Sequence, residues 1–153
     1  MAEIREKLHL PPMSQIGTVV EDLDKAVEYY GSVLGLGPFT KVQIDYVDNF
    51  YYGQPVNPRW VTAFCSLGQI ELEIIQPLAP PTLYNDFLKA QGEGIHHLGF
   101  DITDMDEKLA LCQRIGIKVI QSGRCSNGRF AYLDTREVGG VIFELIQRKA
   151  TRV

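Results

Sequence analysis

Apolar and polar side chains alternate along two stretches of the chain, and each stretch leads into a helical pattern. The alternating stretches cover residues 15–20 and 95–102, and apolar spacings of three and four follow over 23–35 and 105–116. A period of two is typical of a strand with one buried face, and a period of 3.6 is typical of an amphipathic helix. An aspartate stands just before each helical pattern and a glycine ends it, as helix boundaries favour. The sequence therefore predicts two strand–helix units.

The two units are copies of one pattern. Residues 15–24 (QIGTVVEDLD) align without gaps with residues 97–106 (HLGFDITDMD), so that one glycine and two aspartates match. A second pair of segments, ELEIIQPL and VIFELIQR, aligns Glu73 with Glu144. The first pair is 82 residues apart and the second pair 71, so the first copy carries about eleven extra residues. Such self-similarity indicates a duplicated supersecondary unit.

Each copy has two more strand candidates between its paired segments, so the predicted order is one strand, one helix and three strands, twice. The extra residues of the first copy fall in IDYVDNFYYGQPVNPRW, which is rich in turn formers and aromatic residues. The predicted fold class is α+β, with two tandem βαβββ modules in one structural domain. Its parts are an N-terminal extension over 1–12, a first module over 13–78, a linker helix over 79–93 and a second module over 94–148.

Composition excludes several classes of function. The 153 residues carry a formal net charge of -4, which disfavours nucleic-acid binding because phosphates require a basic face. Three cysteines without a C-x-x-C pair predict no disulfide framework and a reducing compartment. The N-terminus, MAEIREKLHLPP, does not resemble a signal peptide, and no apolar run approaches the roughly 20 residues of a membrane helix. We expect a cytoplasmic protein without a membrane or nucleic-acid partner.

Four polar side chains occupy equivalent strand positions in the two copies. The repeat aligns Gln15 with His97 and Glu73 with Glu144, and each of the four lies in the middle of a predicted strand. Glu71 shares a face with Glu73 but falls on an isoleucine in the second copy, so Glu73 is preferred. A buried carboxylate without a partner is strongly destabilising. These groups therefore either satisfy one another in a hydrogen-bonded polar channel or share a cation.

A divalent metal ion suits this set of side chains. One imidazole, two carboxylates and one amide oxygen form a nitrogen–oxygen site for Zn²⁺, Ni²⁺, Co²⁺, Mn²⁺ or Fe²⁺, with room for water or substrate. Alternation places His97 on the polar face of its strand and His96 on the opposite face, together with Leu98 and Phe100. His96 is therefore predicted to face the helices and to be structural.

The chain resembles the vicinal oxygen chelate superfamily, the group of glyoxalase I, the bleomycin-resistance proteins and the extradiol dioxygenases. The resemblance runs from about Met13 to Gln147 and rests on QIGTVVEDLDKAVEYY, IELEIIQPL, GEGIHHLGFDI and GGVIFELIQ. The adjacent histidines of GEGIHHLGFDI and the adjacent glycines of GGVIFELIQ look most like the methylmalonyl-CoA epimerase branch. The resemblance implies a glyoxalase-like fold, in which the sheets of two modules form a cup that holds one metal ion. The first and last strand of each module would each supply a ligand, namely Gln15, Glu73, His97 and Glu144.

The resemblance also implies an activity. The implied enzyme is a divalent-metal-dependent isomerase or lyase. It moves a proton at a carbon next to a carbonyl or thioester through a metal-stabilised enolate. Glu144 and Glu73 are the candidates for base and acid, whereas Gln15 and His97 would be ligands only. The substrate would be a small carbonyl compound or an acyl thioester, as for methylmalonyl-CoA epimerase or lactoylglutathione lyase. A metal-free ligand-binding or resistance module is the alternative, followed by an iron-dependent ring-cleaving dioxygenase, which normally uses two histidines.

Differences from the epimerases concern the substrate. The epimerases usually have histidine where Gln15 stands, and their second catalytic carboxylate falls near Asn57 in this chain. Candidates for the wall of the cup are Phe50, Tyr51, Tyr52, Trp60 and Tyr132. Candidates for binding a substrate anion are Arg59, Arg124 and Arg129. We also expect a homodimer, since many superfamily members pair their chains and the first strand of each module is expected to be exposed.

Overall fold

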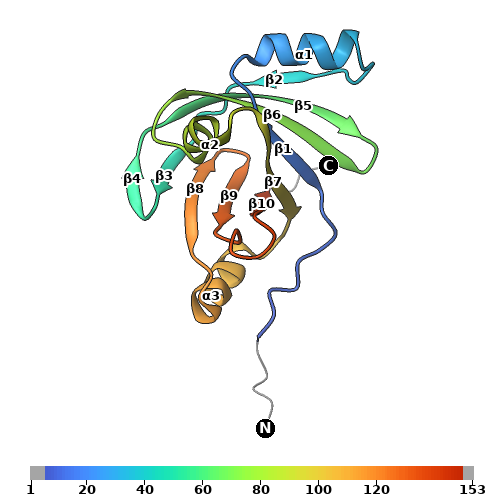
Figure 1. The fold of residues 1–153 in the computed structure, drawn as a ribbon. Coiled ribbons are helices and arrows are strands. Elements are labelled where there is room, and N and C mark those ends of the chain that lie inside the picture. Colours follow the sequence, from blue (N-terminus) through green and yellow to red (C-terminus); the bar gives the residue numbers. More distant parts are fainter. Residues whose placement is uncertain (1–5, 150–153) are drawn as a thin grey trace.

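A single curled sheet forms the body of the protein. The computed structural model describes residues 6–149, which contain ten strands and three helices. In chain order these are β1 (Gln15–Val19), α1 (Leu23–Ser32), β2 (Thr40–Val42), β3 (Val47–Tyr51), β4 (Gln54–Val56), β5 (Arg59–Leu67), β6 (Ile70–Ala79), α2 (Leu83–Gln91), β7 (Gly94–Asp101), α3 (Met105–Ile115), β8 (Val119–Cys125), β9 (Gly128–Leu133) and β10 (Ile142–Arg148). The sheet curves into a cup, as Figure 1 shows, and the predicted α+β class is confirmed. None of the three described helices has the length and apolar character needed to cross a membrane.

The strand order repeats on either side of the middle of the sheet. Strands β1 and β7 pair antiparallel there, and the order outward is β6, β5, β2 on one side and β10, β9, β8 on the other. The first half of the molecule runs from β1 to β6 and the second half from β7 to β10. The first strand of each half pairs in parallel with the last strand of the same half, β1 with β6 and β7 with β10. The first strands are therefore central and not exposed edges, which removes one of the two reasons given above for a homodimer. The edge strands of the sheet are β2 and β4.

Apolar side chains fill three clusters, one inside the cup and two outside it. Helix α1 covers a convex cluster around Leu23, Ala63 and Ile74, and α3 covers a second one around Met105 and Leu145. Helix α2 lies on the concave side of the sheet (Figure 1). The concave cluster contains Val19, Trp60, Ile75, Leu83, Tyr84, Ile120, Phe130, Tyr132 and Ile142. The cup thus has an apolar floor into which the linker helix packs.

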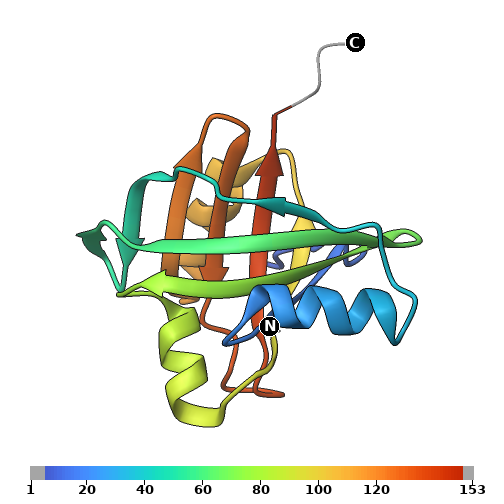
Figure 2. The same ribbon diagram turned by 90° about the horizontal axis from the view of Figure 1, so that it is seen from above.

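The extra residues of the first half form a strand pair that joins the other half. Sequence analysis predicts two strands between the paired segments of the first copy, whereas the structure has four there, namely the short β2, the β3–β4 hairpin and β5, with a loop over 43–46. Strand β2 pairs with β5 of the first half, but β3 pairs with β8 of the second. The loop therefore crosses from one half of the molecule to the other, as Figure 2 shows. It carries Tyr46, whose ring contacts both Trp60 of β5 and Phe130 of β9.

The repeat extends to the hydrogen bonds that begin the two outer helices. The Leu23 amide donates to Gln76 Oε1 at 2.9 Å, and the Met105 amide donates to Gln147 Oε1 at the same distance. Both glutamines lie three residues after the aligned glutamates. Amides in the first turn of a helix have no partner within the helix, so each glutamine satisfies a donor that would otherwise lack one. This role explains why glutamine occurs at both positions.

We expect Gln76→Ala and Gln147→Ala each to lower the free energy of unfolding by about 1 kcal/mol, because each removes the acceptor of a helix-terminal amide. The two sites lie in different halves, so the double variant is expected to lose about the sum. Urea unfolding followed by circular dichroism measures both effects. Gln69→Ala is the control, since Gln69 is exposed. Equal losses from Gln69→Ala and Gln76→Ala would contradict the assignment.

Candidate metal centre

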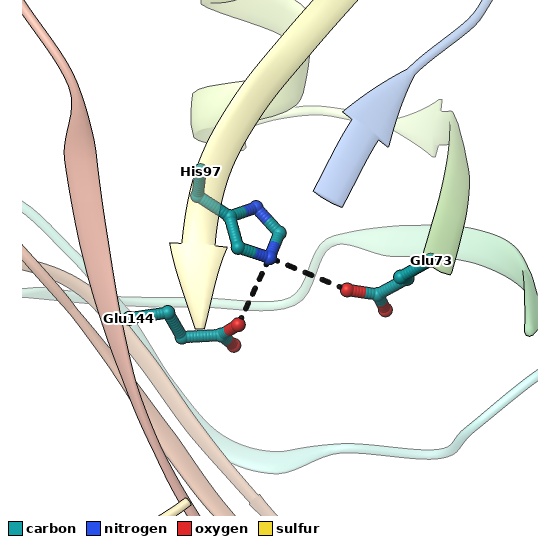
Figure 3. A group of neighbouring side chains, drawn as sticks. All are labelled: Glu73, His97 and Glu144. Atoms are coloured by element: carbon teal, nitrogen blue, oxygen red, sulfur yellow. Dashed lines mark ion pairs between the residues drawn. The ribbon is translucent and has the colours of Figure 1, made fainter. Parts of the chain in front are cut away.

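Four buried polar side chains meet at the middle of the sheet. They come from the neighbouring strands β6, β1, β7 and β10. His97 Nε2 lies 3.0 Å from Glu144 Oε2, 3.5 Å from Glu73 Oε2 and 3.1 Å from Gln15 Oε1. Figure 3 shows the side chains of His97 and the two glutamates pointing toward one another. One ring nitrogen thus faces three oxygen atoms. The four residues that repeat and alternation select are brought together, and their role as ligands remains a prediction.

Two glycines make this meeting possible. Gln15 pairs with Gly99, and Gly17 pairs with His97, across the β1–β7 seam. A Cβ atom on Gly17 would lie 1.9 Å from Cε1 of the His97 ring, and one on Gly99 would lie 2.9 Å from Gln15 Cβ. The glycine of each repeat therefore leaves room for the polar side chain of the other repeat. This need for space explains why glycine occurs at the same position of both repeats.

The amide of Gln15 is oriented by the neighbouring Glu71. Gln15 Nε2 donates to Glu71 Oε1 at 2.9 Å, so Oε1 of the amide points to His97. Arg148 donates to the same oxygen of Glu71 and, through Nε, to Asp101, each at 2.9 Å. Glu71 is thus not one of the groups around His97. It directs Gln15 and joins strands β6, β7 and β10 through Arg148.

The site carries more negative than positive charge. Burial alone would lower the pKa of His97, but the carboxylates of Glu144 and Glu73 outweigh it and raise that pKa to about 9. Burial raises the pKa of Glu73, against the hydrogen bond from His97. Two carboxylates therefore share one cationic ring in a region closed to water. Such an excess of buried negative charge favours binding of a cation.

Tyrosines surround the carboxylates and remain neutral. Burial, together with the charges of Glu73 and Glu144, raises the pKa of Tyr46, Tyr84 and Tyr132. The hydroxyls of Tyr84 and Tyr132 lie 2.9 Å apart, and the ring of Tyr132 packs on that of His97 with centroids 5.0 Å apart. The surroundings of the site are thus aromatic and uncharged.

The structure corrects the prediction that His96 and His97 point to opposite faces of the sheet. Gly17 pairs with His97 but the next residue, Thr18, pairs with Ile95, so His96 is an extra residue in a β-bulge. Both histidines are buried, and both rings contact Tyr132. His96 does pack against a helix, α2, but through the same side of the sheet as His97. Their Nδ1 atoms lie 3.0 Å apart.

Burial, and after it the neighbouring His97, lower the pKa of His96 well below its ordinary value. His96 is therefore a neutral ring and does not add charge to the site. Its Nε2 atom is buried and has no hydrogen-bond partner among the described residues. The His96 ring packs in a T-shaped arrangement with the rings of Tyr84 and Phe87, at centroid distances of 5.2 and 5.3 Å.

The groups present fit a divalent metal ion. Ligand atoms of Glu73, His97 and Glu144 lie within 4.8 Å of one another. Oε2 of Glu144 is buried and receives no well-directed hydrogen bond from residues 6–149, although His97 Nε2 is near. Bonds of about 2.1 Å to a common ion permit ligand separations up to about 4.2 Å, which the contacts around His97 Nε2 satisfy. A mixed nitrogen–oxygen set of this kind accepts several first-row divalent ions.

The predicted wall of the cup is right for some residues and wrong for others. Trp60 and Tyr132 belong to the concave cluster and Tyr51 packs against it, whereas Phe50 and Tyr52 are exposed. Sequence analysis missed Tyr46, Tyr84 and Phe130. Phe130 lies two residues before Tyr132 on the same strand and therefore on the same face, so alternation could have identified it. Nothing in the sequence pattern marks Tyr46, since its loop is neither a strand nor a helix.

The other candidates are not among the buried polar residues of the described chain. Asn57 is exposed and lines a surface pocket that also includes Tyr46 and Trp60. Arg59 lines the same pocket. Arg124 pairs with Asp48, and Arg129 pairs with Asp106 at 2.7 Å, so both guanidinium groups are already engaged.

Comparison with known proteins agrees with this architecture. A family model described as Glyoxalase/Bleomycin resistance protein/Dioxygenase superfamily matches residues 14–132. The uncharacterized protein YqjC of Bacillus subtilis (strain 168) is 28% identical over 141 residues, which are 90% of this chain and 92% of that protein.

Solved structures have the same fold. A methylmalonyl-CoA epimerase variant of Streptomyces coelicolor, in complex with 2-nitronate-propionyl-CoA, has a TM-score of 0.68 at 25% identity, over 92% of this chain and 99% of that one. A hypothetical protein of Bacillus halodurans C-125 has a TM-score of 0.68 at 22% identity, over 92% and 96% of the two chains. The epimerase of Mycobacterium tuberculosis has a TM-score of 0.66 at 20% identity, over 97% and 95%.

We expect Gly17→Ala to displace the His97 ring and to abolish or strongly weaken metal binding, because the added methyl group would overlap that ring. Gly31→Ala is the matched control, since Gly31 lies within α1 and an added Cβ meets nothing closer than 3.7 Å. The control variant should be as stable as the wild type or slightly more so. Zinc binding and thermal unfolding of both variants test this. Zinc binding by Gly17→Ala at the wild-type affinity would refute the packing argument.

We expect zinc affinity to rise about tenfold per pH unit from pH 7 and to level off near pH 9. The pKa of His97 is raised to about 9 in the metal-free protein, so below that pH a proton on the ring must be displaced by the ion. Competition with a chromophoric chelator measures the affinity, and elemental analysis should give about one ion per chain. His97→Ala should remove both the binding and its pH dependence. An affinity independent of pH over this range would contradict the assigned ligand.

Proposed function

Since the chain belongs to the glyoxalase/bleomycin resistance protein/dioxygenase superfamily, we propose that it is a metal-dependent isomerase or lyase of that superfamily. It would move a proton at a carbon next to a carbonyl or thioester. The observation that carries the proposal is the buried group of Glu73, His97 and Glu144 on the concave face of the sheet. Two buried carboxylates beside one imidazole have the composition of a metal site and of an acid–base pair.

Gln15, Glu73, His97 and Glu144 would hold the metal ion. Bound there, a divalent ion supplies Lewis acidity toward the oxygen of a substrate carbonyl as negative charge develops on it. His97 would act in its neutral form, through Nε2, the atom that faces the three oxygens. Gln15 would act through Oε1, since its Nε2 already donates to Glu71. While His97 Nε2 and Gln15 Oε1 are bound to the ion, neither group can take up a proton from a substrate.

Glu144 and Glu73 would transfer the proton. Among the described residues Oε2 of Glu144 receives no well-directed hydrogen bond, although His97 Nε2 lies 3.0 Å away, and this carboxylate would accept the proton from carbon. Burial raises the pKa of Glu73, which suits a carboxyl group that holds and returns a proton. The two glutamates reach His97 from strands on opposite sides of it, β10 and β6. A substrate carbon placed between them would be within reach of one base and one acid.

The aromatic side chains would keep water from the reacting carbon. Tyr46 stacks on Trp60 with ring centroids 4.8 Å apart and packs edge-on to Phe130 at 5.0 Å. Tyr46 joins the concave cluster from the loop that crosses between the two halves. Exclusion of water strengthens each electrostatic interaction with developing charge.

The substrate class follows from the chemistry of proton removal. A hydrogen beside a carbonyl or thioester is acidic enough for a carboxylate base when the carbonyl oxygen is stabilised. The S. coelicolor epimerase structure with similar fold contains an acyl-CoA analogue, 2-nitronate-propionyl-CoA, which supports an acyl thioester as the first class to test. Hemithioacetals of 2-oxoaldehydes are the second, because their hydrogen lies on the carbon next to the remaining carbonyl group.

We expect Glu144→Gln to retain the fold and to lower the rate of proton exchange by about 10²-fold or more, because the amide cannot act as a general base. The measurement is deuterium incorporation from D₂O, followed by NMR, for a panel of acyl-CoA thioesters and hemithioacetals with Mn²⁺, Co²⁺, Ni²⁺ or Zn²⁺. Glu21→Gln is the control, as Glu21 is exposed. Metal content is measured in the same samples, so that a lost ion is not mistaken for a lost base.

Exchange at the wild-type rate in Glu144→Gln would exclude Glu144 as the base. Failure of the wild type to bind any of the four ions would argue instead for a metal-free ligand-binding module on the same fold. In that case the binding of planar ligands, detected by quenching of the single tryptophan, Trp60, would be the activity to measure.

A further inference from the structure

The two neighbouring histidines contact each other through their Nδ1 atoms. These atoms lie 3.0 Å apart, and both rings are buried, His97 completely and His96 to 4% exposure. Side chains of adjacent strand residues normally point to opposite faces. Here the β-bulge at His96 turns both rings to the concave side. The contact therefore depends on an irregularity at this point of the sheet.

The geometry determines which nitrogen of His97 carries hydrogen. Nε2 faces the oxygens of Gln15, Glu73 and Glu144, so Nε2 is the atom that would bind the ion. A neutral imidazole that presents a lone pair at Nε2 must carry its hydrogen on Nδ1. The partner that the described residues offer to this hydrogen is Nδ1 of His96.

The same reasoning determines the state of His96. To accept from His97, Nδ1 of His96 must present a lone pair, so the hydrogen of His96 lies on Nε2. Nε2 of His96 has no hydrogen-bond partner among the described residues, and the His96 ring packs edge-to-face with the rings of Tyr84, Phe87 and Tyr132. Among aromatic rings an N–H group is more favourable than a lone pair without a donor, since the N–H can point to the face of a ring.

We propose that His96 is a positioning residue for the metal ligand His97, which it holds in the tautomer that directs Nε2 to the ion. This inference rests on the proposed metal site. Hydrogen bonds from a ligand histidine to a second group orient the ring and increase its basicity, and their loss typically costs 10–100-fold in metal affinity. The usual partner is a carboxylate, a carbonyl oxygen or water; here it is a neutral imidazole. An uncharged acceptor adds no further negative charge to a site that already contains two carboxylates.

The test compares two substitutions of His96. His96→Asn keeps an acceptor, Oδ1, close to the place of the Nδ1 atom, whereas His96→Leu removes it. Zinc affinity by chelator competition should fall about 10–100-fold in His96→Leu and should stay close to the wild-type value in His96→Asn. Unfolding of the metal-free variants is measured in parallel. A purely structural role would not be rescued by the smaller, polar asparagine.

A spectroscopic measurement on the wild type needs no substitution. Long-range proton–nitrogen NMR correlations distinguish protonated from unprotonated ring nitrogens, and the chain has three histidines, of which His9 is exposed. In the zinc-loaded protein we expect hydrogen on Nδ1 of His97 and on Nε2 of His96. Hydrogen on Nδ1 of His96 would overturn the proposal.

The affinity outcomes separate this proposal from the proposed function. Wild-type affinity in His96→Leu, or an equal loss in both variants, would overturn the role of His96 while leaving the metal site standing. A wild-type protein that binds no zinc, manganese, cobalt or nickel would overturn the metal site itself, and the role of His96 with it.

Discussion

Strands β1 and β7 pair antiparallel in the middle of the sheet, and the close approach of side chains across that pair is the constraint on which the site depends. Each strand carries one of the four polar side chains of the site and, two residues later, a glycine. The polar side chain of one strand occupies the space above the glycine of the other, Gln15 over Gly99 and His97 over Gly17. Strands β6 and β10 then lie beside this pair and add one glutamate each. The sheet order, together with the two glycines, thus brings an amide, an imidazole and two carboxylates to one point.

The electrostatic balance of the cup follows from this crowding. Two glutamates meet one histidine where water is excluded, and the charge of Arg148 is taken up by Glu71 and Asp101 at the rim. The amide of Gln15 is uncharged, and the concave cluster beside the site consists of apolar and neutral aromatic side chains. A buried carboxylate pair of this kind is normally kept in proteins that bind cations or transfer protons, since a hydrophobic replacement would be at least as stable.

Period-two alternation and the internal repeat were sufficient to predict the fold class and the four residues that meet at His97. They succeed because burial of one face fixes the register of a strand, and because duplication places like groups at like positions. Their role as ligands is still a prediction. The bulge at His96 was not predictable, since alternation assumes that no residue is inserted. Tyr46 was missed for a different reason: its position depends on the pairing of β3 with β8, which are far apart in the chain.

That pairing also bears on how the chain folds. Val47 of β3 pairs with Arg124 of β8, 77 residues later (124 minus 47), so the first half is not complete until the second half is in place. Contacts between residues so distant in sequence slow folding, because a long loop must close before they form. During synthesis, β3 leaves the ribosome well before its partner strand exists, with the exposed Phe50 on it. The hairpin that joins the halves therefore makes the duplicated protein a single folding unit, in which neither copy has the complete set of strand partners when produced alone.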